Sequence, residues 1–212
     1  MQSADVQGAP GGTSVVTEAY PLAQLAGDLN IVVVGWNDVS ASVKSVTDSA
    51  GNTYALAIGP TRGTRGPAKL SQSIYYARNI VGGANTVTVT FTKPALYADV
   101  RIAEYQGLNL QNPLDVAVGK TGTSTSASSG AKTTTAPNEL IFGAGMTFGV
   151  YTSAGSGFTL RQGVTRYGDL IEDRTVTTKG SYSATATTRA GKNRVVFWLM
   201  QMVTFRAATS TP

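Results

Sequence analysis

The segment ADVRIAEYQGL (98–108) holds the residue whose position most invites a chemical interpretation. Ala98, Val100 and Ile102 occupy one face of a predicted strand. Glu104 takes the next position on that face. It is either a buried structural acid or the acid–base group of a functional site. The chain has no His and no Cys. This excludes imidazole bases, thiol nucleophiles, Ser-His-Asp triads and Cys/His zinc sites.

Carboxylates therefore carry any acid–base chemistry. A β-sandwich glycosidase needs two of them roughly 5–10 Å apart across a cleft, and Glu104 with Glu172 is a conceivable pair because both fall in predicted strands. We match Glu104 to Gln201 in a second, similar strand, and a Gln cannot act as a base. We therefore predict that no residue is catalytic and that the chain is not an enzyme. Glu104 should be buried and hydrogen-bonded to Gln201 or to backbone amides; a glycan-active enzyme is the third alternative.

The opposite face of the 98–108 strand suggests binding instead. With Ala98, Val100 and Ile102 in the core, that face presents two tyrosines on either side of an arginine. Aromatic rings between polar groups stack on sugars or anchor a protein partner. The alternative is that a loop such as 120–138 covers this face and forms a second small core. The predicted ligand-binding residues are Tyr97, Arg101, Tyr105, Trp198 and Trp36.

Asp38, Asp48 and Asn52 cluster near predicted strand ends and are weak candidates for calcium. Calcium prefers several oxygen ligands, but the spacing matches no EF-hand. Turn formation explains Asp and Asn at these positions equally well. We predict no metal site and no cofactor, with a structural calcium as the alternative.

Nearly every segment alternates with period two or forms a short β-branched run bounded by Gly, Asn or Pro, which predicts strands. We find no convincing amphipathic helix. The fold class is therefore all-β, an antiparallel β-sandwich of jelly-roll type. The predicted strands cover residues 13–20, 29–36, 42–48, 53–58, 71–79, 85–92, 97–106, 114–119, 138–146, 170–178, 181–188 and 194–205.

Two halves of the chain are similar on either side of 120–138, a Ser/Thr/Gly-rich stretch that is a flexible loop or a strand exposed on one face. AGDLNIVVVGW (26–36) matches APNELIFGAGM (136–146), with an acid, a Leu and an apolar strand in each. This predicts pseudo-repeated halves of one sandwich, since a cut between them would leave each with half a core. The expected division is a flexible lead or docking segment at 1–12, one β-sandwich domain at 13–206 and a tail at 207–212.

The net charge is +5, with basic residues in loops at 61–69 and 189–194 but no run of five. We interpret these as solvated loops, with attraction to an anionic polymer or cell surface as the alternative, and predict no specific nucleic-acid binding. The sequence contains no stretch of about 18 apolar residues, so we predict no membrane insertion. The N-terminus lacks the pattern of a signal peptide. Charged residues make up only 14 % of the chain, against roughly 25 % in soluble domains. Such a Thr-, Ser- and Gly-rich composition is typical of β-rich extracellular surfaces.

The motifs AGDLNIVVVGWND, SVTDSAGNTY, RIAEYQGL and PNELIFGAG together resemble a β-sandwich domain that recurs in large secreted or surface-attached bacterial proteins. The resemblance covers about residues 13–206 and implies a secreted or cell-surface location. On this basis we predict a non-enzymatic structural, adhesion or self-assembling module. The alternative is a carbohydrate-binding module that uses the exposed aromatic face. The expected partners are other copies of the chain or a surface polysaccharide.

Overall fold

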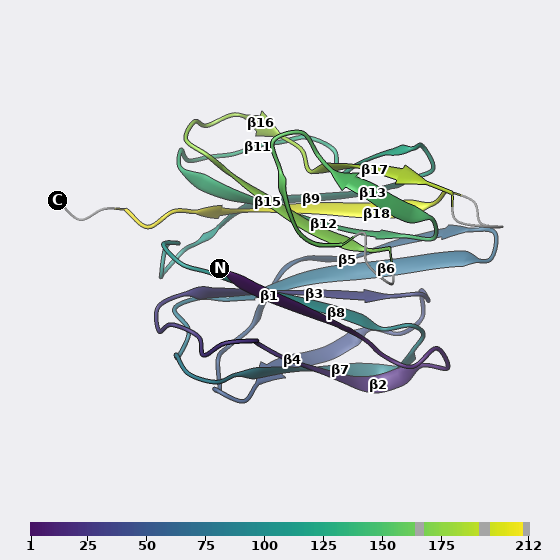
Figure 1. Cartoon of the computed structure of the whole chain (residues 1–212), viewed down its shortest axis with the longest axis horizontal. Helices are drawn as coiled ribbons and strands as arrows, with labels where there is room; N and C mark the ends of the chain where they lie inside the picture. Colours follow the sequence, from purple (N-terminus) through teal and green to yellow (C-terminus); the bar gives the residue numbers. More distant parts are fainter. Residues whose placement is uncertain (164–167, 191–195, 210–212) are drawn as a thin grey trace.

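Eighteen strands form the described part of the chain in a computed structural model, which describes residues 1–163, 168–190 and 196–209 (Figure 1). All the strand pairs are antiparallel, which confirms the predicted all-β, antiparallel fold class. Within these three ranges no helix has the length and apolar character that crossing a membrane requires.

The first half of the chain forms a five-stranded sheet in the order β1-β8-β3-β6-β5 and a three-stranded sheet in the order β2-β7-β4. The strands are β1 (Gln2–Gln7), β2 (Thr13–Ala19), β3 (Leu29–Trp36), β4 (Val43–Asp48), β5 (Ala55–Arg65), β6 (Ala68–Ala77), β7 (Thr86–Ala95) and β8 (Asp99–Tyr105).

The second half has a five-stranded sheet in the order β9-β18-β12-β15-β14 and a three-stranded sheet in the order β10-β17-β13. These orders correspond strand for strand to those of the first half, and the pair β11-β16 is additional. The strands are β9 (Leu114–Gly122), β10 (Ser126–Ser128), β11 (Lys132–Thr133), β12 (Glu139–Thr147), β13 (Val150–Ala154), β14 (Thr159–Gly163), β15 (Leu170–Val176), β16 (Ser181–Tyr182), β17 (Thr185–Arg189) and β18 (Trp198–Arg206).

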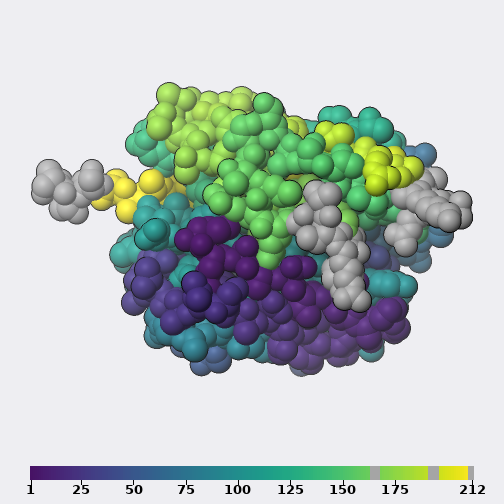
Figure 2. Space-filling view, viewed as in Figure 1, coloured from purple at the N-terminus to yellow at the C-terminus, as the bar shows by residue number. Residues whose placement is uncertain are grey.

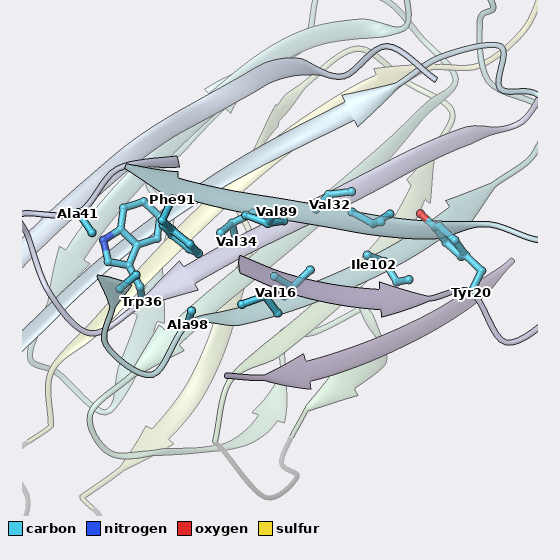
Figure 3. Close-up of a cluster of buried hydrophobic side chains, with 13 residues drawn as sticks. Val16, Tyr20, Val32, Val34, Trp36, Ala41, Val89, Phe91, Ala98 and Ile102 are labelled. Carbon is cyan, nitrogen blue, oxygen red and sulfur yellow. The ribbon is translucent and has the colours of Figure 1, made fainter. Parts of the chain in front are cut away.

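The two five-stranded sheets pack face to face, and each is covered on its outer side by the smaller sheets of its own half (Figure 1). Four apolar clusters result, and the fourth, which also joins the halves, contains Ala68 and Leu70 of the first half and Met146, Phe197 and Leu199 of the second. The first core lies inside the first half and includes Trp36 and Phe91 (Figure 3). The central core joins the halves through residues such as Ile31 and Phe142. The third core lies inside the second half, around Tyr151.

Strand β3 shows why the two central sheets are apolar on both faces. Its alternate residues Val32, Val34 and Trp36 point into the first core, whereas Ile31 and Val33 point into the central core. Period-two alternation therefore supplies two cores at once, and every residue of β3 is buried. A strand buried on both faces is a nearly continuous apolar run, as LNIVVVGW is.

Several segments differ from their expected form. Residues 2–7 of the expected lead form β1, which pairs with β8 in the chain's own sheet. Figure 2 shows these purple residues on the surface beside green residues of the second half, in agreement with the contact of β1 with β14. The stretch 120–138, expected as a flexible loop or as a strand exposed on one face, contains the end of β9 and the short strands β10 and β11, so it is strand in part. Each half also has a core of its own, in addition to the two apolar clusters that they share.

Candidate functional site

The predicted binding face of β8 is buried. Ala98, Val100 and Ile102 point into the first core, as expected. On the other face, however, Arg101 is 2 % exposed and Tyr105 is 6 % exposed, because the five-stranded sheet of the second half covers them. The covering element is a sheet and not the expected loop at 120–138.

The remaining aromatic candidates do not form an exposed face either. Trp36 is fully buried in the first core, with its ring 5.5 Å from that of Phe91 in an edge-on arrangement. Trp198 is buried in the third core, where its indole N–H donates to the carbonyl oxygen of Ser124 at 2.8 Å. Tyr97 is 42 % exposed, but it lies in the turn before β8 with a φ of 46°. The expectation of an exposed aromatic sheet face is therefore wrong.

Arg101 is the centre of a polar cluster between the two five-stranded sheets. Its Nη1 donates to the carbonyl oxygens of Gly145 and Leu170 in the second half, at 2.9 and 2.8 Å. Its Nη2 donates to Oε1 of Gln72 at 3.0 Å, and its Nε lies 2.5 Å from a carboxylate oxygen of Asp99. The guanidinium group thus links the two halves through the two hydrogen bonds of Nη1. We call Gln72, Asp99, Arg101, Asp169 and Gln201 the central polar cluster.

Gln201 belongs to this cluster from the side of β18. Its Oε1 accepts a hydrogen bond from Nε2 of Gln72 at 2.9 Å, and its Nε2 donates to Oγ1 of Thr61 at 2.8 Å.

The strand pairing shows which residues of the two halves correspond. Leu29 pairs with Tyr105 and Leu140 pairs with Phe205, and all four side chains face the central core. Counting back four residues from Tyr105 along β8 and from Phe205 along β18 makes Arg101 the residue that corresponds to Gln201. The assignment of Gln201 as the counterpart of Glu104 is therefore wrong.

Glu104 is a structural acid. It is 5 % exposed, its Oε1 accepts a hydrogen bond from the amide of Leu25 at 2.9 Å, and its Oε2 accepts one from the side chain of Gln2 at 2.5 Å. The predicted burial and backbone hydrogen bond are confirmed, whereas the bond to Gln201 is not formed. Ala103, the preceding residue, faces the central core, so Glu104 points to the opposite side of its sheet.

Glu172 is buried in the other half of the molecule. Its neighbour Ile171 faces the central core, so Glu172 faces the third core, where its Oε2 accepts a hydrogen bond from the amide of Gly155 at 2.8 Å. Both five-stranded sheets lie between it and Glu104, and packed sheets stand roughly 10 Å apart. The two carboxylates cannot flank one cleft. Burial raises the pKa of Glu172 to about 7.

The acids near Arg101 also have raised pKa values. Burial raises the pKa of Asp99, and the guanidinium of Arg101 opposes this rise. Burial raises the pKa of Asp169 to about 7, and this carboxylate accepts a hydrogen bond from the amide of Thr147 at 3.0 Å. The positive charge of Arg101 lowers the pKa of both buried acids, but burial outweighs this effect at each of them.

The weak calcium candidates are used in turns at opposite ends of β4. Asp38 accepts hydrogen bonds from the amides of Ser40 and Ala41, just before the strand begins. Asp48 is the last residue of the strand and accepts from the amide and side chain of Asn52. A strand of six residues spans roughly 17 Å, so Asp38 and Asp48 cannot bind one ion together. In the described ranges, no group of three or more His, Cys, Asp or Glu residues is arranged to hold a metal ion.

The two basic segments have different outcomes. Residues 61–69, expected as a loop, are the end of the β5–β6 hairpin. Arg62 donates to the carbonyl oxygen of Ala41 at 2.8 Å, with its guanidinium 6.0 Å from the ring centre of Trp36. In the other segment, residues 191–194 lie outside the described residues.

A polar hollow of about 540 Å³ lies at the edge of the first half, between the β4–β5 loop and the end of β6. We call it the β6 hollow. Sequence reasoning missed it because its walls come from segments that only the pairing of β5 with β6 brings together. The sequence feature that could have indicated this hollow is the pair Tyr76 and Arg78, which lie two positions apart at the end of a predicted strand. The β6 hollow is lined by Gly51, Asn52, Thr53, Ala55, Tyr76, Arg78 and Asn79.

Fold and site together describe an all-β protein of two stacked sandwiches with a buried polar cluster between them and a polar hollow at one edge. Comparison of the chain with protein-family models, with curated proteins and with solved structures found no match.

Proposed function

We propose that this chain is a non-enzymatic structural and adhesion module of a secreted or surface-attached bacterial protein, with each half a jelly roll. The observation that supports this most is the contact between the halves. Arg101 of β8 donates hydrogen bonds to two carbonyl oxygens of the second half, in a polar cluster that lies between the two apolar clusters shared by the halves. Two sandwiches joined in this way resist bending and hold their outer surfaces in a constant arrangement.

The positions of the acids support a role without catalysis. Glycosidase activity would require Glu104 and Glu172 as a pair. These residues lie in different halves and accept structural hydrogen bonds. The partners that we propose are a surface polysaccharide or other copies of the chain. The net charge of +5 favours an anionic polymer among these partners.

Adhesion of coated beads tests this function. The chain has no cysteine, so Thr64→Cys in the exposed end of the β5–β6 hairpin gives one attachment point. We expect coated beads to cluster with each other or to retain bacterial surface polysaccharide, without release of sugars. Beads that stay dispersed and bind no polysaccharide, while circular dichroism shows a folded coat, would overturn the proposal. Release of sugars that Glu104→Gln abolishes would also overturn it.

A further inference from the structure

The β6 hollow has a wall that is held in place before any ligand arrives. The amide and the side-chain nitrogen of Asn52 donate to the two carboxylate oxygens of Asp48, at 2.9 and 2.8 Å. The side-chain oxygen of Asn52 accepts from the amide of Val81 at 2.8 Å. These bonds tie the β4–β5 loop to both neighbouring segments. A preformed wall lowers the entropy cost of binding.

An aromatic side chain lies in the opposite wall. Tyr76 is half-buried near the end of β6, and its ring meets that of Phe205 edge-on at 5.5 Å. This contact with the central core fixes the ring. The residue paired with Tyr76 on the edge strand β5 is Ala55, whose small side chain leaves the space beside the ring open. A fixed aromatic ring at an open hollow suits the C–H face of a sugar ring.

Arg78 supplies a positive charge to the same hollow. It follows β6 by one residue, is exposed, and forms no ion pair within the described ranges. A guanidinium group binds a carboxylate through two parallel hydrogen bonds. Thr53 and Asn79 add a hydroxyl and a carboxamide to the lining, which can bond to sugar hydroxyls. The volume falls within the range of roughly 300–1,000 Å³ that is usual for small-molecule sites.

We propose that the β6 hollow binds a uronic acid unit of an acidic polysaccharide, with its carboxylate on Arg78 and its ring against Tyr76. This inference rests on the proposed adhesion function and names the ligand class for its polysaccharide partner. It also moves sugar binding away from the face of β8, whose tyrosine and arginine are buried between the halves.

The test is a calorimetric titration of the full chain with tri-galacturonate, with cellotriose as the neutral comparison. We expect tri-galacturonate to bind and cellotriose to bind at least tenfold more weakly. Arg78→Gln should weaken tri-galacturonate binding about tenfold or more. The matched control is Lys69→Gln, which removes the same charge near the other end of β6, roughly 30 Å away, and should change the affinity less than twofold.

A second variant keeps the charge and changes only the space. Ala55→Leu places a larger side chain beside Tyr76, and we expect a loss of affinity similar to that of Arg78→Gln. Because Ala55 is exposed on an edge strand, this variant should fold.

Equal weakening by Arg78→Gln and Lys69→Gln, equal binding of both trisaccharides, or no binding at all would overturn the site. If tri-galacturonate does not bind and coated beads still cluster, this site is wrong and the proposed function stands. If it binds at the β6 hollow and coated beads neither cluster nor retain polysaccharide, the site is supported and the proposed function is wrong.

Discussion

Arg101 in β8 and Arg78, which follows β6 by one residue, both belong to the first half, but their surroundings are opposite in character. Arg101 is 2 % exposed, and its guanidinium group is occupied by two carbonyl oxygens, a glutamine and a carboxylate. Arg78 is exposed at the rim of the β6 hollow, with no ion pair in the part of the chain that the structure describes. The same type of residue therefore stabilises the fold at one position and is available to a ligand at the other. Burial, and not residue type, separates the two roles.

The largest expected effect comes from removing the buried arginine. Arg101→Met leaves Asp99 without its partner and removes two hydrogen bonds between the halves. Breaking a buried pair from one side costs about 3–5 kcal/mol, so we expect the free energy of unfolding to fall by that amount in urea titrations. A change below about 1 kcal/mol would show that the central polar cluster does not hold the halves together.

The next effect is a dependence of stability on pH. Burial raises the pKa of Glu172 from 4.5 to about 7, so between these pH values the folded state keeps a proton that the unfolded state releases. The contribution of this group to stability therefore falls as the pH rises through this window, by about 3 kcal/mol at roughly 1.4 kcal/mol per unit. Burial raises the pKa of Asp169 to about 7, which acts in the same direction.

Glu172→Gln tests this assignment, because a glutamine oxygen can still accept the hydrogen bond from Gly155. We expect the variant to lose about 3 kcal/mol less stability than the parent chain between pH 5 and pH 8, as measured by thermal unfolding, and to keep the part of the pH dependence that Asp169 contributes. Identical pH profiles for the two proteins would contradict the raised pKa.

A smaller effect is expected from the other side of the central polar cluster. Gln201→Leu removes the hydrogen bonds to Gln72 and Thr61 and should lower the free energy of unfolding by about 1–3 kcal/mol. Gln111→Leu, at an exposed position, is the control and should change it by less than about 0.5 kcal/mol. If the two variants are equally stable, Gln201 contributes nothing to the junction.

The smallest effect on stability completes the comparison of the two arginines. Arg78→Gln should change the free energy of unfolding by less than about 0.5 kcal/mol, because the side chain is exposed and unpaired within the described ranges. The same substitution is the one that should abolish most of the tri-galacturonate affinity. A large loss of stability would mean that Arg78 holds the fold and would weaken its contrast with Arg101.

Local patterns predicted one face of the central strands correctly and misread the other. Ala98, Val100 and Ile102 point into a core as their alternation indicates. The partner face, with Arg101 and Tyr105, has the polar and aromatic composition of a binding surface, yet it is covered by the second half. Period two shows that a strand has two faces, but it does not show what lies against the second one.

The comparison of the halves failed by a small shift in register. Sequence similarity alone matched Glu104 to Gln201, whereas the pairing of β8 with β3 and of β18 with β12 matches Arg101 to Gln201. The similarity is too weak to fix an alignment to one residue. In a strand, a shift of a single residue moves every side chain to the opposite face.

The amino-acid sequence by itself determined that the chain is all-β, because alternation and turn residues act over a few positions and need no distant partner. It also determined that acid–base chemistry would have to use carboxylates, since His and Cys are absent. Only the tertiary structure decided which groups are buried. Stacking the two five-stranded sheets buried Arg101 with its acids, and pairing β5 with β6 placed Tyr76 and Arg78 at an open hollow. Both outcomes depend on contacts between residues far apart in the chain, which no local pattern contains.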